Sequence, residues 1–292
     1  MTLRIGTRGS VLALAQARAV AHALPEPAEL VTITTAGDLD QRGGDKSRWV
    51  GALEAALLAG DIDLAVHSAK DVPGELAPGT ALVATPRRAD PFDVLVGERS
   101  LAHVREGARV GTSAVRRRAQ LLAVRPDLDV RELRGNVDTR LKKRAGGEVD
   151  VLVLAAAGLD RLDRRHEAGG TLRGDVFVPA PGQGIIAVQA RTGSAAGEVA
   201  AAAGHARTMA WLAAERAVVR DFSATCHTPV GIHADSAHVC GFAGLPDGSA
   251  WLVDEVPVDG EDVRAAAEEL ARRMLAAGVA DLLQDAERMA AA

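Results

Sequence analysis

The chain has 292 residues, of which 48% are hydrophobic and 25% are charged, and this composition excludes a disordered or fibrous protein. Aromatic residues make up only 2% of it, with no Tyr, so stacking platforms for nucleic acid bases are hard to build. Because the formal net charge is -5, the surface as a whole does not attract a polyanion. Nucleic acid is therefore not an expected partner, and any anion site must be local.

Strand and helix alternate in the first part of the chain. The pattern predicts strands at 3–6, 31–35 and 62–67 and helices at 10–24 and 49–59. This alternation is typical of a parallel sheet with helices on both faces, whose ligand sites lie at the carboxyl ends of the strands.

The pattern starts again near Val110. Ile5 to Arg8 resembles Val110 to Ser113, and each segment leads into a helix that contains Ala-Gln. Further strands are predicted at 129–133 and 150–155, with a helix at 136–144 between them. We therefore expect two related doubly wound α/β lobes.

Two proline-bounded segments, Arg87 to Pro91 and Pro179 to Gly184, punctuate the chain between these repeats. They predict that the chain crosses twice between the lobes, with residues 1–86 plus about 180–204 in the first lobe and 92–178 in the second. Such a hinged pair has a ligand cleft between its lobes.

The character of the sequence changes from about Ala206. A helix at 208–220, strands at 238–242 and 250–256 and a last helix at 261–277 are predicted. A Pro-Asp-Gly-Ser turn joins the two strands, so residues 206–292 are expected to form a small C-terminal α+β domain with an antiparallel sheet.

The chain starts with a strand-like pattern rather than a secretory signal, and no apolar run approaches the roughly 18 residues of a membrane span. A cytoplasmic protein without a membrane partner is expected, and a monomer suffices. Its two cysteines, Cys226 and Cys240, are then expected to be free thiols. No Cys or His pair has zinc spacing, so no metal is expected. No phosphate-binding glycine motif follows a strand either, which disfavours a nucleotide.

Hydroxyl and basic side chains follow several predicted strands, where helix N-termini favour anions. They are Thr7, Arg8, Ser10, Thr112, Ser113, Arg116, Arg117, Arg134, Arg140 and Arg161. For Ser and Thr the alternative is simple helix capping, with solvated arginines beside them. Their recurrence in both repeats favours a ligand with several carboxylates or phosphates, since a guanidinium group binds these bidentately.

A Lys-Asp pair, Lys70 and Asp71, leaves the carboxyl end of the third predicted strand. The alternative is a surface ion pair. An aspartate among arginines stays ionised, so Asp71 is suited to stabilising a cation and to moving a proton. His67 is interpreted as a hydrogen-bonded core histidine. Cys226 differs from Cys240, for which a buried inert thiol is expected, because it lies in a loop of small residues.

Several segments together resemble the porphobilinogen deaminase family. They are Ile5-Gly6-Thr7-Arg8-Gly9-Ser10, Val66-His67-Ser68-Ala69-Lys70-Asp71-Val72-Pro73, Gly111-Thr112-Ser113 with Arg116-Arg117, Leu133-Arg134-Gly135-Asn136, Ala157-Gly158-Leu159 with Arg161, Pro181-Gly182-Gln183-Gly184, and Cys226 before Pro229-Val230-Gly231. They occur in the family's order over nearly the whole chain, and the combination is specific.

The resemblance implies periplasmic-binding-protein-like lobes and a transferase of haem and other tetrapyrrole biosynthesis. Such an enzyme joins four molecules of porphobilinogen head to tail, with loss of ammonia, into linear hydroxymethylbilane. It also implies a dipyrromethane cofactor on a thioether to Cys226, with Asp71 and Lys70 catalytic. Lys70, Asp71, Ser113, Arg116 and Arg117 would bind the cofactor, and Arg8, Ser10, Thr112, Arg134, Arg140 and Arg161 the substrate. Lys46 and Trp49 fall near the family's mobile active-site segment.

The sequence departs from the family pattern at two places. Phe222 to Thr225 is bulkier and less free in φ than the Gly-bearing stretch that commonly precedes the cysteine. Gln189 stands where a Glu is usual, which predicts an amide in place of a carboxylate contact at the domain junction. The competing hypothesis is a two-lobed binding protein for polycarboxylate anions, without catalysis.

Overall fold

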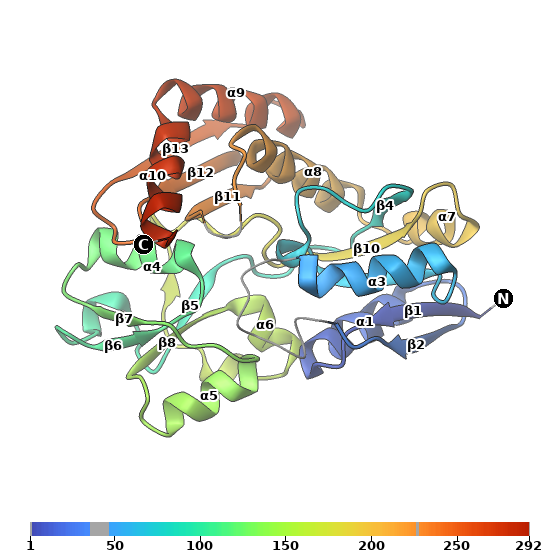
Figure 1. Ribbon diagram of the computed structural model, residues 1–292, viewed down its shortest axis with the longest axis horizontal. Coiled ribbons are helices and arrows are strands. Elements are labelled where there is room, and N and C mark those ends of the chain that lie inside the picture. Colours follow the sequence, from blue (N-terminus) through green and yellow to red (C-terminus); the bar gives the residue numbers. More distant parts are fainter. Residues whose placement is uncertain (1, 36–46, 226–227, 292) are drawn as a thin grey trace. The chain divides into compact units, whose positions relative to one another are not determined.

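The computed structural model describes residues 2–35, 47–225 and 228–291. The chain forms two compact units, the first from Met1–Ala89 and Gly182–Leu212 and the second from Asp90–Pro181 and Ala213–Ala292. Each unit contains a five-stranded sheet, and the second also contains a three-stranded one (Figure 1). No helix among the described residues has the length and apolar character needed to cross a membrane.

The sheet of the first unit has the strand order β2-β1-β3-β10-β4. Its strands are β1 (Leu3–Thr7), β2 (Ala28–Thr32), β3 (Leu64–Ser68), β4 (Thr80–Ala84) and β10 (Ile186–Arg191). β1 is parallel to β2 and β3, but β10 is antiparallel to both of its neighbours. The predicted parallel arrangement is confirmed for β1, β2 and β3, whereas β10, which the sequence did not predict, runs antiparallel. The returning chain enters beside the carboxyl end of β3, where Ala69 N donates to Ile185 O, and must run back along that strand.

Helices cover both faces of this sheet, as predicted. α1 (Val11–Ala23) and α7 (Ala195–Ala202) pack on one face, and α3 (Ser47–Ala59) packs on the other. The side chains of Ala17 and Val20 bury against Ile5 and Val66 on the first face, and Leu53 and Leu57 of α3 bury against Ile62 and Ala65 on the second. Burial of aliphatic surface on both faces fixes the sheet as a central layer.

The predicted bounds of β2 were wrong by three residues. β-branched residues at 31–35 suggested the strand, yet β2 pairs with β1 from Leu3↔Ala28 to Thr7↔Thr32. The length of the partner strand, rather than local propensity, sets where β2 begins and ends.

The second unit contains a sheet of the order β7-β6-β8-β5-β9. Its strands are β5 (Asp93–Val96), β6 (Arg109–Gly111), β7 (Asp129–Arg131), β8 (Val151–Ala155) and β9 (Thr171–Leu172), with α4 (Val115–Val124) on one face and α5 (Val137–Ala145) and α6 (Ala156–Arg161) on the other. β5 is antiparallel to β8 and β9, as β10 is to its neighbours in the first sheet. The two sheets thus share one topology, which confirms the prediction of two related doubly wound lobes.

The C-terminal part of the second unit is an antiparallel sheet with helices on one face. It contains β11 (Val230–Ala234), β12 (His238–Gly244), β13 (Trp251–Pro257), α9 (Val263–Ala276) and α10 (Val279–Ala291), and α8 (Ala206–Asp221) precedes it. Single turns of 3-10 helix lie at η1 (Ala69–Asp71), η2 (Leu101–His103) and η3 (Arg165–Glu167).

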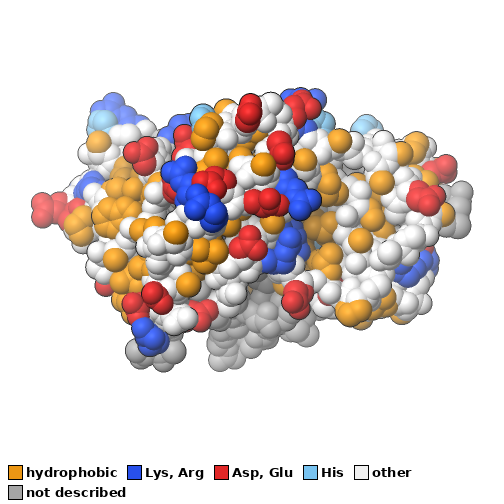
Figure 2. Space-filling view, turned by 90° about the horizontal axis from the view of Figure 1, so that it is seen from above, with side chains coloured by type: hydrophobic (Ala, Val, Ile, Leu, Met, Phe, Trp, Pro, Cys, Tyr) orange, Lys and Arg blue, Asp and Glu red, His pale blue; other side chains and the backbone are white. Residues whose placement is uncertain are grey.

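The predicted hairpin between β12 and β13 is confirmed, with Gly248 at a φ of 73° in its turn. Phe242 on the other face of this sheet is fully buried with Ala119 and Val178 of the second lobe. α10 was not predicted, because Gly278 signals a helix end there. Its φ of 93° does end α9, but a new helix starts at the next residue. The outer face of α9 mixes basic and acidic side chains (Figure 2), including the pair Arg264–Glu268.

Candidate active site

The Lys-Asp pair lies on η1, directly after β3 in the first unit. Asp71 is partly exposed, and the Lys70 Nζ lies 3.5 Å from Oε1 of Gln183. Gln16 of α1 donates to Ser68 Oγ at 2.8 Å, which ties the end of β3 to the neighbouring helix. The strand end therefore presents an ammonium and a carboxylate on a short, well-held turn.

His67 is buried on β3, as predicted for a core histidine. Its Nε2 lies 3.1 Å from Oε1 of Gln189, and burial lowers the pKa of its imidazole to about 4. The expectation that Gln189 stands at a domain junction is wrong. Gln189 is on β10 inside the first sheet, and its amide also donates to Glu54 Oε1 at 2.8 Å.

The loop from β1 to α1 carries Arg8 and Ser10. Ser10 caps α1 by accepting a hydrogen bond from Ala13 N at 3.2 Å, so the capping alternative describes its contact here. The Arg8 guanidinium lies 3.9 Å from the ring centroid of Trp49 on α3, a cation–π contact. Trp49 is thus placed beside a predicted substrate residue, whereas Lys46 lies outside the described residues.

In the second unit, Ser113 and Arg140 come together after β6. The Ser113 Oγ accepts a hydrogen bond from Nη2 of Arg140 at 2.9 Å, and Nε of Arg140 donates to Gly135 O at 2.8 Å. Thr112 is buried, and its Oγ1 accepts from Ala114 N at 3.2 Å. Two predicted ligand-binding residues from separate segments therefore form one local donor group.

Arg116 and Arg117 on α4 are both buried against Asp93 of β5, with ion-pair distances of 2.7 Å each. Burial alone would raise the pKa of Asp93, but the two guanidinium groups outweigh burial and hold this pKa well below its ordinary range. Arg116 Nε is buried and has no hydrogen-bond partner within the described ranges. These arginines thus have a protein carboxylate as their partner, while one buried N–H of Arg116 remains available.

Sequence reasoning missed Asp93. The signal for it is an acidic residue that opens the apolar run Asp93-Val94-Leu95-Val96, where a buried carboxylate needs a basic partner elsewhere.

The remaining predicted arginines lie in different surroundings. Arg134 is partly exposed and donates to Glu132 Oε1 at 2.6 Å. Arg161 ends α6, and burial lowers the pKa of its guanidinium to about 10 against the opposing effect of Asp160. A cation held at this desolvation cost is suited to an anionic partner.

Cys226 lies outside the described residues, but the segment before it is seen. Phe222 is buried, and Ser223 has a φ of 50°, a left-handed conformation that glycine adopts more easily. Ser223 thus adopts a backbone conformation that costs a serine more than a glycine. Cys240 is a free thiol that donates to Glu255 Oε2 at 3.0 Å; it is partly exposed rather than buried, and desolvation and this carboxylate raise its pKa, so it stays protonated.

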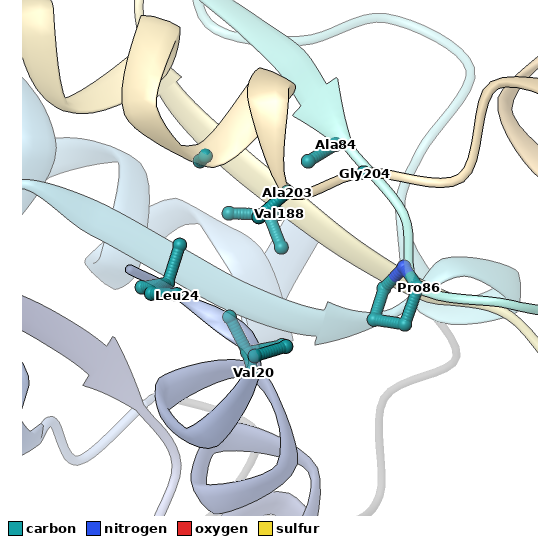
Figure 3. A pocket seen from close by; sticks show the side chains of 9 residues that line it. Val20, Leu24, Ala84, Pro86, Val188, Ala203 and Gly204 are labelled. Atoms are coloured by element: carbon teal, nitrogen blue, oxygen red, sulfur yellow. The ribbon is translucent and has the colours of Figure 1, made fainter. Parts of the chain in front are cut away.

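Two further features bear on ligands. An apolar hollow in the first unit is lined by Val20, Ala23, Leu24, Ala84, Pro86, Val188, Ala200, Ala203 and Gly204 (Figure 3). It offers no charged side chain to an anion. Within the described part of the chain, no group of His, Cys, Asp and Glu could hold a metal ion.

The fold and these side chains define an α/β protein with a duplicated lobe, in which basic and hydroxyl groups follow the strands of both copies. A sequence model described as "Porphobilinogen deaminase, dipyromethane cofactor binding domain" matches residues 3–198. The chain belongs to the porphobilinogen deaminase family.

Relatives named porphobilinogen deaminase match the chain almost end to end. The protein of Deinococcus radiodurans is 41% identical over 97% of this chain and 98% of its own, and that of Thermus thermophilus is 42% identical over 96% and 97%. The Roseiflexus castenholzii protein is 45% identical over 85% and 87%.

Among solved structures, the second substrate binding domain of a putative amino acid ABC transporter from Streptococcus pneumoniae has a TM-score of 0.43 and 11% identity, over 70% of this chain and 91% of that one. Similarity at this level does not bear on function.

Proposed function

We propose that the chain is a hydroxymethylbilane synthase, which condenses four porphobilinogen molecules head to tail with loss of ammonia. The observation that carries the proposal is that relatives named porphobilinogen deaminase match nearly the full length, while Asp71 and Lys70 stand on η1 at the end of β3. The hypothesis of a non-catalytic binding protein is not favoured, because it does not account for this family membership.

The chemistry of the substrate fits the residues at the strand ends. Porphobilinogen carries an acetate and a propionate, so each added unit brings two carboxylates that need basic partners. Arg8, Lys70, Arg134, Arg140 and Arg161 supply such cations, and Ser10, Thr112 and Ser113 supply hydroxyl donors. Porphobilinogen also has a pyrrole N–H and loses an amine, which calls for an acceptor and an anionic group.

Asp71 is proposed as that group. Loss of ammonia leaves a cation on the substrate, and a partly exposed carboxylate on a fixed turn can stabilise this cation and accept a hydrogen bond from the pyrrole N–H. Lys70 beside it would bind a carboxylate, with its ammonium oriented by Gln183. The proposed division of work is that Asp71 acts on the reacting cation and the arginines hold the carboxylates in place.

A dipyrromethane cofactor belongs to the matched family domain, and we propose that it is attached through a thioether to Cys226. The donor set fits a group with four carboxylates, since Arg116 has an unpartnered buried Nε and Arg140 and Ser113 form one donor group. Arg117, Lys70 and Asp71 complete the proposed cofactor contacts. When bound, the group supplies the pyrrole end from which the product grows.

Intact mass measurement of the purified protein tests the attachment. We expect a mass above that of the sequence by one dipyrromethane, lost in Cys226→Ser and kept in Cys240→Ser, which is the matched control. An unmodified protein that is nevertheless active would contradict the proposal. Ehrlich's aldehyde reagent, which colours dipyrromethane, gives a second readout.

We further propose a cytoplasmic monomer. Light scattering during gel filtration checks the oligomeric state, with an expected mass near 30.2 kDa.

A further inference from the structure

Three buried polar side chains from different elements meet in the first unit. Gln189 of β10 is fully buried, and Glu54 of α3 and His67 of β3 are nearly so. The Gln189 amide donates to Glu54 Oε1 and to Thr80 Oγ1, both at 2.8 Å, and its Oε1 lies 3.1 Å from Nε2 of His67. These three side chains and Thr80 form what we call the Gln189 network.

The network joins both ends of the segment that carries Lys70 and Asp71. His67 lies on the strand that leads into this segment, and Thr80 begins the strand that follows it. Glu54 Oε1 also accepts a hydrogen bond from Ala77 N at 2.9 Å, shortly before β4. Since β10 lies between β3 and β4 in the sheet, Gln189 is placed where one side chain can reach both strands.

Hydrogen bonding also fixes the tautomer of the His67 imidazole. Both amide hydrogens of Gln189 are donated to Glu54 and Thr80, so its Oε1 is an acceptor and His67 must carry its proton on Nε2. The charges that act on this imidazole are Glu54, Asp71 and Arg8. Because burial keeps the pKa of His67 near 4, the imidazole is neutral at neutral pH.

We propose that Gln189 is a positioning residue for Lys70 and Asp71, and that its neutral amide avoids placing a second carboxylate beside the buried Glu54 in this chain. Its effect on turnover rests on the proposed function, whereas its hydrogen bonding does not. A carboxylate at this position would lie within 3 Å of Glu54 Oε1, and two buried carboxylates at this distance cannot both ionise without strong repulsion. Gln189 therefore adds no second titratable carboxyl group where β3 and β4 hold the segment that carries Lys70 and Asp71.

Gln189→Glu tests the proposal through the pH dependence of kcat. At low pH the added acid takes up a proton and the network persists. As pH rises the proton is lost, the two carboxylates repel and the segment shifts. We expect the ratio of variant to wild-type kcat to fall roughly 10-fold or more between pH 6 and pH 8.5, since a 1 Å misplacement costs up to about 100-fold.

Two variants separate positioning from simple loss of stability. Val188→Ala weakens the same buried strand without adding charge, so its ratio to wild type should stay constant with pH. In Glu54→Gln/Gln189→Glu only one carboxylate remains, and the high-pH loss should largely disappear. A well-folded Gln189→Glu with a pH-independent ratio overturns the proposal.

A measurement without substrate covers the case in which the variant does not fold or the proposed function fails. In wild type, nitrogen chemical shifts of the imidazoles, with His67→Gln to identify the signal, should show a neutral ring protonated on Nε2 from pH 8 to pH 5. A ring protonated on Nδ1, or one that titrates near pH 6.5, overturns the network itself.

Discussion

The two lobes share a frame down to single residues. Arg4 of β1 forms an ion pair with Asp63 ahead of β3, at 2.9 Å, and Arg109 of β6 does the same with Asp150 ahead of β8, at 2.7 Å. In each lobe the glycine two residues after this arginine is closely packed, since a Cβ would require the terminal methyl of Ile62 to shift in the first lobe and that of Leu152 in the second. These contacts recur at equivalent positions in both copies of the repeat.

The two lobes differ in which polar side chains they bury and in what those side chains bind. In each sheet the antiparallel strand that enters from the other unit carries a buried polar residue, Gln189 on β10 and Asp93 on β5. Gln189 holds a network with a neutral imidazole, and the Lys70–Asp71 pair stays partly exposed. Asp93 instead holds Arg116 and Arg117 in the interior. The same fold therefore leaves the Asp71 carboxylate partly exposed in the first lobe. In the second lobe it buries the Asp93 carboxylate, which holds two arginines in place.

The largest effect is expected on turnover and at Asp71, whose carboxylate is proposed to act in catalysis, whereas that of Asp93 pairs with two buried arginines. Asp71→Asn should lower kcat about 100-fold to 10,000-fold, because it removes the charge that faces the cation, with the thermal midpoint nearly unchanged. Steady-state kinetics measures the loss. Asp61→Asn, at an exposed aspartate of the same lobe, is the matched control and should keep wild-type turnover. A kcat within a few-fold of wild type in Asp71→Asn would rule out the assigned role.

In the second lobe, loss of a carboxylate is expected to lower stability. Asp93→Asn leaves two buried guanidinium groups without a counter-charge and should lower the free energy of unfolding by about 3–5 kcal/mol. Urea denaturation measures this. Asp63→Asn is the comparison in the first lobe and should cost less, because the Arg4 side chain is 37% exposed and water replaces its partner. Equal losses in both variants would remove the distinction between the lobes.

Acid should weaken the His67 and Asp93 sites in different pH ranges. The pKa of His67 is about 4 in the folded protein against an ordinary 6.5, so the unfolded chain binds more protons and stability falls as pH decreases from 6.5 to 4. This shift corresponds to roughly 3 kcal/mol at most. The pKa of Asp93 is depressed, so its contribution is complete above about pH 4 and is lost only at lower pH.

Denaturation at a series of pH values tests this order. His67→Gln should remove the slope between pH 6.5 and 4 and leave the loss below pH 4. If the slope persists in His67→Gln, another group is responsible for it.

The smallest effects are expected at the two serines. Ser10→Ala removes the cap of α1 and should cost about 1 kcal/mol of stability. Ser113→Ala should change stability less, because Arg140 keeps its bond to Gly135 O, but should raise KM by freeing the Arg140 guanidinium from its oriented position. Thermal unfolding and kinetics on the same samples distinguish the two. A larger stability loss in Ser113→Ala than in Ser10→Ala would reverse the comparison.

Much of the fold could be predicted because it is coded locally. The helix from Ser10 was expected from its cap and Ala-rich pattern, and the hairpin at Pro246 to Ser249 from its turn residues. The antiparallel direction of β10 could not be predicted, because a strand's direction depends on where the chain re-enters the sheet. The end of the predicted last helix was found, but α10 was missed because a glycine stop does not say whether another helix follows.

For the candidate site, the sequence predicted which side chains follow the strands but not what they contact. Arg116 and Arg117 were expected to face a ligand, and the structure gives them Asp93, which lies more than twenty residues earlier in the chain. Ser113 and Arg140 were both predicted, yet their direct contact was not.

The sequence by itself determined the family, the repeat, the helix caps and the residues that follow each strand, since these depend on neighbours a few positions away. Only the tertiary structure decided which buried polar groups meet. Glu54, His67 and Gln189 come from segments far apart in the chain, and so do Asp93 and its two arginines. The physical reason is that a buried polar group needs a partner in space, and folding alone brings that partner within hydrogen-bond distance.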